Sequence, residues 1–324
     1  MSKILTISIA AYNVEHYLEQ CLGSLLIPSL DKLEVIIEND GSKDATAVIG
    51  KKYEEQYPGV FVLVNKENGG YGSTINNSIR LATGKYFKQL DGDDWYHTEH
   101  LEELVTQLES IEADCVYTPH LKVYEDSDSQ SLELLTELNN GLMSVDDFVK
   151  IAGVPQMHTM AFRTQLLREN NITILEHCFY TDQEYVLYPL MQIKTVYVFD
   201  KYIYCYRLGV AGQSVSLEGW RKHIGDHERV IKQLMARYDA WNNGSPIVNS
   251  AILYHICSLL RDHNSLYMVL GDKQVEMKQL DAYIRRKHPV VYMAKNKVEG
   301  KRIKLIRWSG FTLYMLLRKK TFAG

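Results

Sequence analysis

The first 120 residues alternate between short apolar segments typical of buried strands and longer segments with a helical repeat of apolar residues. The five expected strands cover residues 4–9, 33–38, 60–64, 85–90 and 114–118. The four expected helices lie between them, over residues 14–26, 43–57, 73–82 and 98–110. Because parallel strands need crossover connections, this alternation predicts an α/β fold with a mainly parallel sheet flanked by helices.

The later part of the chain changes character. Residues 125–143 are polar and poorly patterned, so we expect a loop there. Further strands are expected over residues 156–163 and 195–207, around a helix over 181–191. From about residue 220 the pattern is helical, over residues 221–241, 247–270 and 272–287. We therefore predict an α/β domain over residues 1–215 and a helical C-terminal region over 216–324.

Polar turns follow three of the expected strands. They are Tyr12-Asn13 after the first strand, residues 39–42 after the second and residues 91–94 after the fourth. In an open parallel sheet, ligands bind outside the carboxyl ends of the strands. Because all three turns fall on that edge, the sequence predicts one binding site built from them.

The turn after the fourth strand holds three carboxylates, Asp91, Asp93 and Asp94. Such charge at a strand end is unfavourable unless a cation or solvent compensates it. Alternate carboxylates suit Mg²⁺ or Mn²⁺, either of which can also hold substrate phosphates. An EF-hand loop starting at Asp91 is excluded, because its fifth and sixth positions would be Trp95 and Tyr96.

Several other sites are excluded by their missing motifs. The chain has no dinucleotide-binding Gly-x-Gly-x-x-Gly, no Gly-Lys-Ser/Thr phosphate loop and no Gly-x-Ser-x-Gly elbow. Its five cysteines show no Cys-x-x-Cys spacing, and a histidine-pair zinc motif is absent.

Four segments, in order, resemble glycosyltransferase family 2 of the bacterial surface-polysaccharide type, which comprises inverting nucleotide-sugar enzymes with the GT-A fold. They are Ile7–Asn13, Val35–Asp44, Asn68–Asn77 and Ala82–Asp94. The resemblance is dense over residues 4–120 and thinner to about 215. It implies a UDP-sugar donor, a metal ion and transfer to a glycan acceptor.

The resemblance also implies roles for individual residues. Asp40 would accept a hydrogen bond from the nucleobase, most often uracil, with Ala10 and Tyr12 beside the base. Asp91 would lie near the ribose, the diphosphate and the metal, and Asp93 would be the principal metal ligand.

Each assignment has a structural alternative. Tyr12 could be a packing residue, Asp40 a turn-forming residue, and Asp94 either a support for the metal site or a helix N-cap. The chain also departs from the family at Asn39, where an acid is usual.

Inverting transfer needs a base that removes a proton from the acceptor hydroxyl. The family places this base in an acidic pair that opens a helix, and the matching segment here is His177–Tyr185. Asp182 takes the position of the base, and Thr181 replaces the usual first acid as an expected helix N-cap. Glu184 is a second candidate. Alternatively, both carboxylates merely stabilise the start of the helix.

These features predict a non-processive inverting hexosyltransferase acting on a glycan, lipid-linked and part of surface-polysaccharide biosynthesis. The Gln-x-x-Arg-Trp signature of processive synthases is absent. One alternative is a nucleotidyltransferase, although Ala10–Asn13 stands where its glycine-rich loop would be. Another is a non-catalytic protein that binds a nucleotide-sugar or a partner.

Charge is unevenly distributed. The chain carries a net charge of −4, whereas residues 295–324 hold nine Lys or Arg and one acid, which gives +8 there and −12 elsewhere. This basic tail suits an interfacial helix on anionic lipid, or a packed terminal helix with a solvated basic face. The remaining acidic surface argues against nucleic acid as a partner, and a homodimer stays open.

The cysteines and the N-terminus predict a location. Five cysteines without a recognisable signal peptide indicate the cytoplasm. The basic tail adds the expectation of peripheral contact at the inner face of the membrane. Among weaker candidates, His158 is expected to be a packing residue, and His223 or His227 could reach the metal. Residues 212–214 could form a loop over the donor or a plain turn.

Overall fold

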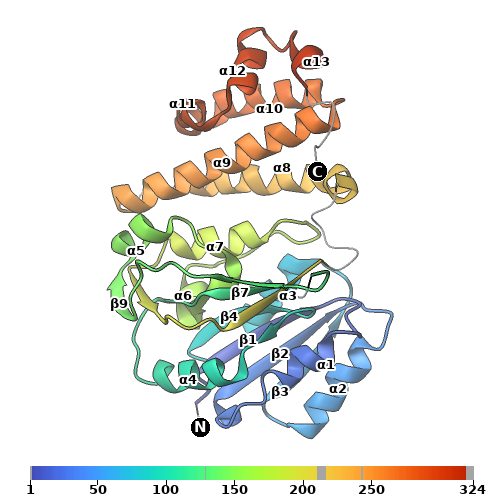
Figure 1. Ribbon diagram of the computed structural model, residues 1–324, viewed down its shortest axis with the longest axis vertical. Coiled ribbons are helices and arrows are strands. Elements are labelled where there is room, and N and C mark those ends of the chain that lie inside the picture. The colour runs from blue at the N-terminus through green and yellow to red at the C-terminus, as the bar shows by residue number, and fades with distance from the viewer. Residues whose placement is uncertain (1, 128, 210–216, 242–243, 319–324) are drawn as a thin grey trace. The chain divides into compact units, whose positions relative to one another are not determined.

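The computed structural model describes residues 2–127, 129–209, 217–241 and 244–318 (Figure 1). The chain divides into two compact units, Met1–Ala211 and Gly212–Gly324. The predicted boundary after residue 215 and the predicted loop over 212–214 lie outside the described residues. Each unit is therefore described by itself.

The main sheet of the first unit has eight strands. Their order is β3 (Phe61–Lys66), β2 (Leu33–Asp40), β1 (Leu5–Ala11), β4 (Tyr86–Asp91), β10 (Met160–Arg163), β6 (Cys115–Tyr117), β11 (Thr195–Val198) and β9 (Gly141–Ser144). The first four strands are parallel, β10 is antiparallel to both neighbours, and β11 is parallel to β6. The prediction of a mainly parallel α/β sheet is confirmed.

Helices cover both faces of this sheet (Figure 1). On one face, α1 (Leu18–Gly23) and α4 (Thr98–Leu108) bury apolar side chains in the same core as Ile7 and Ile37. Glu38 points to the other face, where it accepts hydrogen bonds from Asn77 and Ser78 of α3 (Tyr71–Leu81). This alternation along β2 shows how a strand with period two serves both faces.

The remaining helices of the unit complete these two layers. α2 (Thr46–Gln56) packs on β2 and β3, α5 (Val145–Ala152) on β9 and β11, and α6 (Thr164–Glu169) on β10 and α3. In α7 (Asp182–Leu190), the Tyr185 ring packs edge-on against Phe87 of β4 and Phe162 of β10. These contacts fix the start of α7 over the middle of the sheet.

A second, smaller sheet was only partly predicted. Its order is β5 (Trp95–Tyr96), β12 (Tyr204–Leu208), β7 (His120–Tyr124) and β8 (Ser129–Glu133). The expectation of a loop over residues 125–143 is wrong, since β8 and the start of β9 lie within it. β8 pairs antiparallel with β7, and its polar, largely exposed side chains give no apolar alternation that would reveal a strand.

The second unit is helical, as predicted. It contains α8 (Leu217–Ala240), α9 (Pro246–Leu270), α10 (Gln274–Lys287), α11 (Pro289–Val298), α12 (Lys301–Trp308) and α13 (Tyr314–Leu317). The start of α9 is capped by Ser245, whose hydroxyl accepts from the Val248 amide, and its end by Gly271 in a left-handed conformation. Within the described ranges, no helix is long and apolar enough to cross a membrane.

Candidate active site

Three predicted site residues lie at the carboxyl ends of adjacent parallel strands. In the register of the sheet, Ala10 of β1 pairs with Asp91 of β4 on one side and with Glu38 of β2 on the other. Asp40 ends β2 two residues further on. Tyr12 follows β1 directly, with 51% of its surface exposed. The predicted sheet edge therefore holds Ala10, Tyr12, Asp40 and Asp91.

The carboxylate of Asp40 is buried and already bonded within the protein. Its two oxygens accept from the backbone amides of Gly69 and Gly70, each at 2.9 Å, and from the ammonium of Lys66. Lys66 also donates to the Ser73 hydroxyl at 2.7 Å. Asp40 thus holds the turn that opens α3, and its contact with a nucleobase stays a prediction.

A metal-ligating set lies at the end of β4. Asp91, Asp94 and His158 each offer one ligand atom, and these atoms lie within 4.8 Å of one another. Asp91 Oδ1 and His158 Nδ1 are buried, and neither has a hydrogen-bond partner in the described part of the chain. His158 comes from the short 3₁₀ helix η2 (Met157–Thr159). Two carboxylates and one imidazole are ligands that Mn²⁺ accepts.

The charge states of this set depend on its burial. Burial, followed by the charge of Asp93, raises the pKa of Asp91. Burial and then Asp91 raise the pKa of Asp94 well above its ordinary value. Burial lowers the pKa of His158 to about 3, so its ring is neutral and able to bind a metal. A divalent cation would relieve the repulsion between the carboxylates, so these residues fit the predicted metal ion.

Asp93 is not part of this set, although the sequence predicted it as the principal ligand. Its side chain is half-buried, and its backbone carbonyl accepts from Nε of Arg207 at 2.8 Å. Its role as a ligand stays a prediction. The reading of Asp94 as a helix N-cap is wrong, because α4 begins at Thr98 and is capped by His97.

Two residues of β12, which no local motif revealed, hold the acidic turn. The Tyr204 hydroxyl donates to Asp94 Oδ2 at 2.6 Å and accepts from the Asp91 amide at 3.2 Å. The Arg207 amide donates to Asp94 Oδ1 at 2.7 Å. The acidic turn is therefore fixed by a strand more than 100 residues further along the chain.

The guanidinium of Arg207 completes this anchor. It lies 4.9 Å from the ring centre of Tyr17 and 4.8 Å from that of Trp95, which are cation–π distances. It also donates to Gln20 Oε1 at 2.6 Å and forms an ion pair with Glu125. These contacts join β12 to α1, to the acidic turn and to the segment after β7.

Asp182, the predicted base, is the first residue of α7. Its carboxylate accepts from Gln183 Nε2 at 2.8 Å, and burial raises its pKa. After burial and nearer groups, the charge of Asp182 contributes to the raised pKa values of Asp91 and Tyr71. Thr181 occupies the N-cap position, but the cap hydrogen bond expected from its hydroxyl is not formed.

Glu184 has a structural role in this segment. It is buried, and it accepts from the Leu175 amide at 2.8 Å and from the Tyr188 hydroxyl at 2.7 Å. The carboxylate therefore fixes the approach to α7. Asp182 stays the predicted base of this segment.

The two other predicted histidines are bonded within the helical unit. His223 Nδ1 lies 3.2 Å from an oxygen of Asp226, and His227 Nδ1 lies 3.0 Å from Nδ1 of His263. A role of either at the metal stays a prediction.

Comparisons with known proteins agree on one family. A sequence model described as "Glycosyl transferase family 2" matches residues 6–179. The putative glycosyltransferase EpsH of Bacillus subtilis (strain 168) is 34% identical over 119 residues, which cover 37% of this chain and 34% of EpsH. The chain thus matches about a third of the length of this relative.

Two solved structures resemble nearly the whole chain. S. aureus TarS 1-349, in complex with UDP-GlcNAc, superposes with a TM-score of 0.61 at 17% identity and covers 95% of this chain and 92% of that one. The mannosyltransferase PcManGT from Pyrobaculum calidifontis, with GDP-Man and Mn²⁺, gives a TM-score of 0.55 at 16% identity, over 98% and 86%. The predicted GT-A-like fold is confirmed.

Proposed function

Since the matched residues make up more than half of it, this chain belongs to glycosyltransferase family 2, and we propose that it transfers a single hexose from a UDP-sugar, with inversion, to a hydroxyl of a glycan. Family membership was predicted from four sequence segments and is confirmed by the match. The nucleotidyltransferase alternative is thereby set aside.

The observation that carries the proposal is the set of Asp91, Asp94 and His158 at the carboxyl end of β4. A nucleotide-sugar donor presents a diphosphate, and buried carboxylates do not bind a diphosphate without a cation between them. Mn²⁺ or Mg²⁺ held by these residues would stabilise the charge of the departing diphosphate. UDP as the nucleotide is supported by TarS, which was solved with UDP-GlcNAc.

Asp182 is proposed as the general base. As the acceptor oxygen bonds to the anomeric carbon, the bond from that carbon to the diphosphate breaks, and the hydroxyl proton passes to the Asp182 carboxylate. Burial raises the pKa of Asp182 from its ordinary value, which makes the carboxylate a better proton acceptor. Asp182 is also among the groups that raise the pKa of Asp91, after burial and Asp93, and this influence supports the role.

The acceptor and the location are inferred from fewer observations. We propose a lipid-linked glycan of a bacterial surface polysaccharide and a cytoplasmic enzyme at the inner face of the membrane. All five cysteines are buried and free of disulfides, which fits a reducing compartment. The absence of the Gln-x-x-Arg-Trp signature supports single addition.

The test is metal-dependent release of UDP from UDP-Glc, UDP-Gal, UDP-GlcNAc and UDP-GalNAc, with Asp182→Asn beside the native protein. We expect the variant to keep its affinity for UDP with Mn²⁺ and to lose transfer. Asp200→Asn, which alters an exposed carboxylate of the same unit, is the matched control. Retained turnover by Asp182→Asn would refute the base, and no turnover with any donor would favour a non-catalytic binding protein.

A second experiment decides between Asp93, the ligand predicted from the sequence, and His158, a member of the candidate set at the end of β4. Asp93→Ala and His158→Ala are compared by titrating Mn²⁺ and UDP. If Asp91, Asp94 and His158 are the protein's metal ligands, His158→Ala weakens Mn²⁺-dependent UDP binding more than Asp93→Ala does. The reverse order would show that Asp93 is the principal ligand, as the sequence predicted, and unchanged UDP affinity in both would count against the site.

A further inference from the structure

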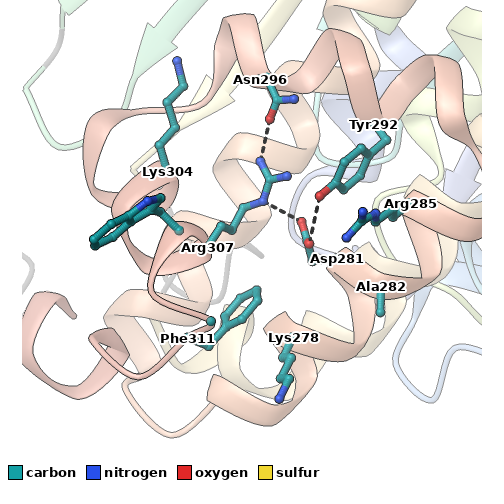
Figure 2. A pocket seen from close by; sticks show the side chains of 11 residues that line it. Lys278, Asp281, Ala282, Arg285, Tyr292, Asn296, Lys304, Arg307 and Phe311 are labelled. Atoms are coloured by element: carbon teal, nitrogen blue, oxygen red, sulfur yellow. Dashed lines mark hydrogen bonds and ion pairs between the residues drawn. The ribbon is translucent and has the colours of Figure 1, made fainter.

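A basic pocket lies in the helical unit, among α10, α11 and α12 (Figure 2). Its volume is about 550 Å³. Its polar lining includes four cationic side chains and one carboxylate, namely Lys278, Arg285, Lys304, Arg307 and Asp281. The pocket is built from residues of the second unit alone, whereas the acidic site belongs to the first.

The carboxylates at the pocket are already neutralised. Asp281 accepts from Lys295 at 2.6 Å and forms an ion pair with Arg307 at 2.8 Å. The buried Glu299 bonds to the same two cations, at 3.0 Å and 2.6 Å. Figure 2 shows Arg307 held between Asp281 and Asn296. Two acids and two bases thus cancel, so Asp281 and Arg307 add no net charge to the lining of the pocket.

Three cations of the pocket remain uncompensated. Lys278, Arg285 and Lys304 are exposed, and no ion pair joins any of them to an acid in the described part of the chain. Between Gln274 and Arg318 the chain has eleven Lys or Arg and three Asp or Glu. The third acid, Glu276, pairs with Lys273 at 3.0 Å. The pocket therefore offers positive charge that only a ligand can neutralise.

Apolar side chains border this charge. Trp308 lines the pocket with 83% of its surface exposed, and Leu305, in the same helix, is 41% exposed. Large exposed apolar groups beside uncompensated bases are typical of surfaces that meet both lipid headgroups and acyl chains, where tryptophan is favoured. A soluble anion or a nucleic acid would leave these side chains in water.

We propose that this pocket binds the phosphate headgroup of an anionic membrane lipid, with Lys278, Arg285 and Lys304 contacting the phosphate and Trp308 entering the interfacial layer. The charge complementarity argues for an anionic lipid, and the apolar border argues for a membrane. The inference extends the proposed function, since a lipid-linked acceptor would lie at such a surface. The proposal assigns membrane binding to a defined pocket, whereas the sequence predicted only a general attraction between the basic tail and anionic lipid.

The test uses the full-length protein and vesicles of phosphatidylcholine with or without phosphatidylglycerol, in a flotation assay. We expect binding to the vesicles with phosphatidylglycerol only. Arg285→Gln/Lys304→Gln should weaken it about thirtyfold, because each cation near an anionic surface contributes roughly fivefold. The matched control is Lys297→Gln/Arg302→Gln, which removes the same charge from exposed residues of the tail that do not line the pocket.

The two pairs separate a site from a diffuse charge. The site is supported if the pocket variant loses at least several times more affinity for the anionic vesicles than the control variant does. Equal losses of affinity in the two variants overturn it. Inorganic phosphate that competes fully with the vesicles would show a soluble-anion site and would also overturn the proposal. Blue-shifted tryptophan emission on binding, absent in Trp308→Phe, supports entry of Trp308 into the interface. None of these measurements involves sugar transfer, so failure here leaves the proposed transfer reaction standing and counts only against the proposed membrane contact.

Discussion

Like charges gather in both units of this protein, under opposite conditions. In the first unit, Asp91 and Asp94 lie in a buried group, where burial and then neighbouring carboxylates raise their pKa values. In the second, Lys278, Arg285 and Lys304 are exposed around an open pocket. Water screens the exposed group, whereas the buried group interacts at a low effective dielectric constant.

The difference teaches what each group requires of a ligand. The buried carboxylates destabilise the unit that contains them until a cation binds, so they select a small ion of high charge. The exposed cations destabilise the fold little, because water screens them. They therefore suit a large anionic surface, and their binding to it should weaken as the salt concentration rises. The buried carboxylates of the first unit therefore predict a bound metal ion, and the exposed cations of the second predict a docking partner.

The largest expected effect comes from removing one buried charge. Asp91→Asn should lower kcat/KM by about 10³-fold or more, because metal stabilisation of the leaving group contributes several kcal/mol. The same change should leave the melting temperature unchanged or raise it when metal is absent, because it removes a repelled carboxylate. Calorimetry with EDTA and turnover with Mn²⁺ measure the two effects, and a marked fall in melting temperature would break the comparison.

The next effect concerns the support of the acidic turn. Tyr204→Phe removes the hydroxyl that bonds to Asp94 and to the Asp91 amide, and should weaken Mn²⁺ binding by about 10- to 100-fold. Tyr202→Phe, two residues earlier, is the control. Isothermal titration with Mn²⁺ and UDP measures the affinity. Equal affinities in the two variants would mean that the turn holds its ligands without β12.

A smaller effect should appear as pH dependence of stability. Burial and Asp93 raise the pKa of Asp91 to about 7, so the folded state keeps a proton that the unfolded chain releases near pH 4. This contribution is present below pH 4 and is lost as the pH rises to about 7, on the order of 4 kcal/mol without metal. Denaturant unfolding from pH 5 to 8 measures it. Mn²⁺ should oppose the loss, and Asp91→Asn should show a flatter profile.

The smallest effect is expected at the exposed cations. Lys278→Gln/Lys304→Gln should shift the melting temperature by less than about 2 °C, because neither side chain forms an ion pair with the described residues. Thermal unfolding monitored by circular dichroism tests this. A large destabilisation would show that these cations hold the helical unit together and are not held ready for a ligand.

The sequence predicted the first half of the fold well because its signals are local. The apolar runs of β1, β2 and β4 and the turns after them are each continuous in the chain, and β1 pairs in parallel with both of the other strands. The exposed strand β8 was not predicted. It pairs with β7 through backbone hydrogen bonds, and its polar side chains show no alternation of apolar residues that would indicate a strand.

The candidate site was predicted only in part, because only some of its residues lie in segments with a local sequence signal. Asp91 was found from its position at the end of an apolar run. His158, Tyr204 and Arg207 join it through tertiary packing, and their sequence separations from Asp94 reach 113 residues. No local pattern marks them. His158 looked like a packing residue, and its ring is indeed stacked on Tyr206 at 4.4 Å, yet it also turns a nitrogen toward two carboxylates.

The anchoring of the acidic turn by β12 limits how far the chain can be shortened. A fragment ending at residue 179, where the family match stops, would keep every acidic residue of the turn but lose Tyr204 and Arg207. During synthesis, the same two residues leave the ribosome long after the parallel strands have emerged. The chain would then be able to bind a metal ion only after β12, the last strand of the smaller sheet in chain order, has been made. Completion of the first unit would thus coincide with the start of its activity.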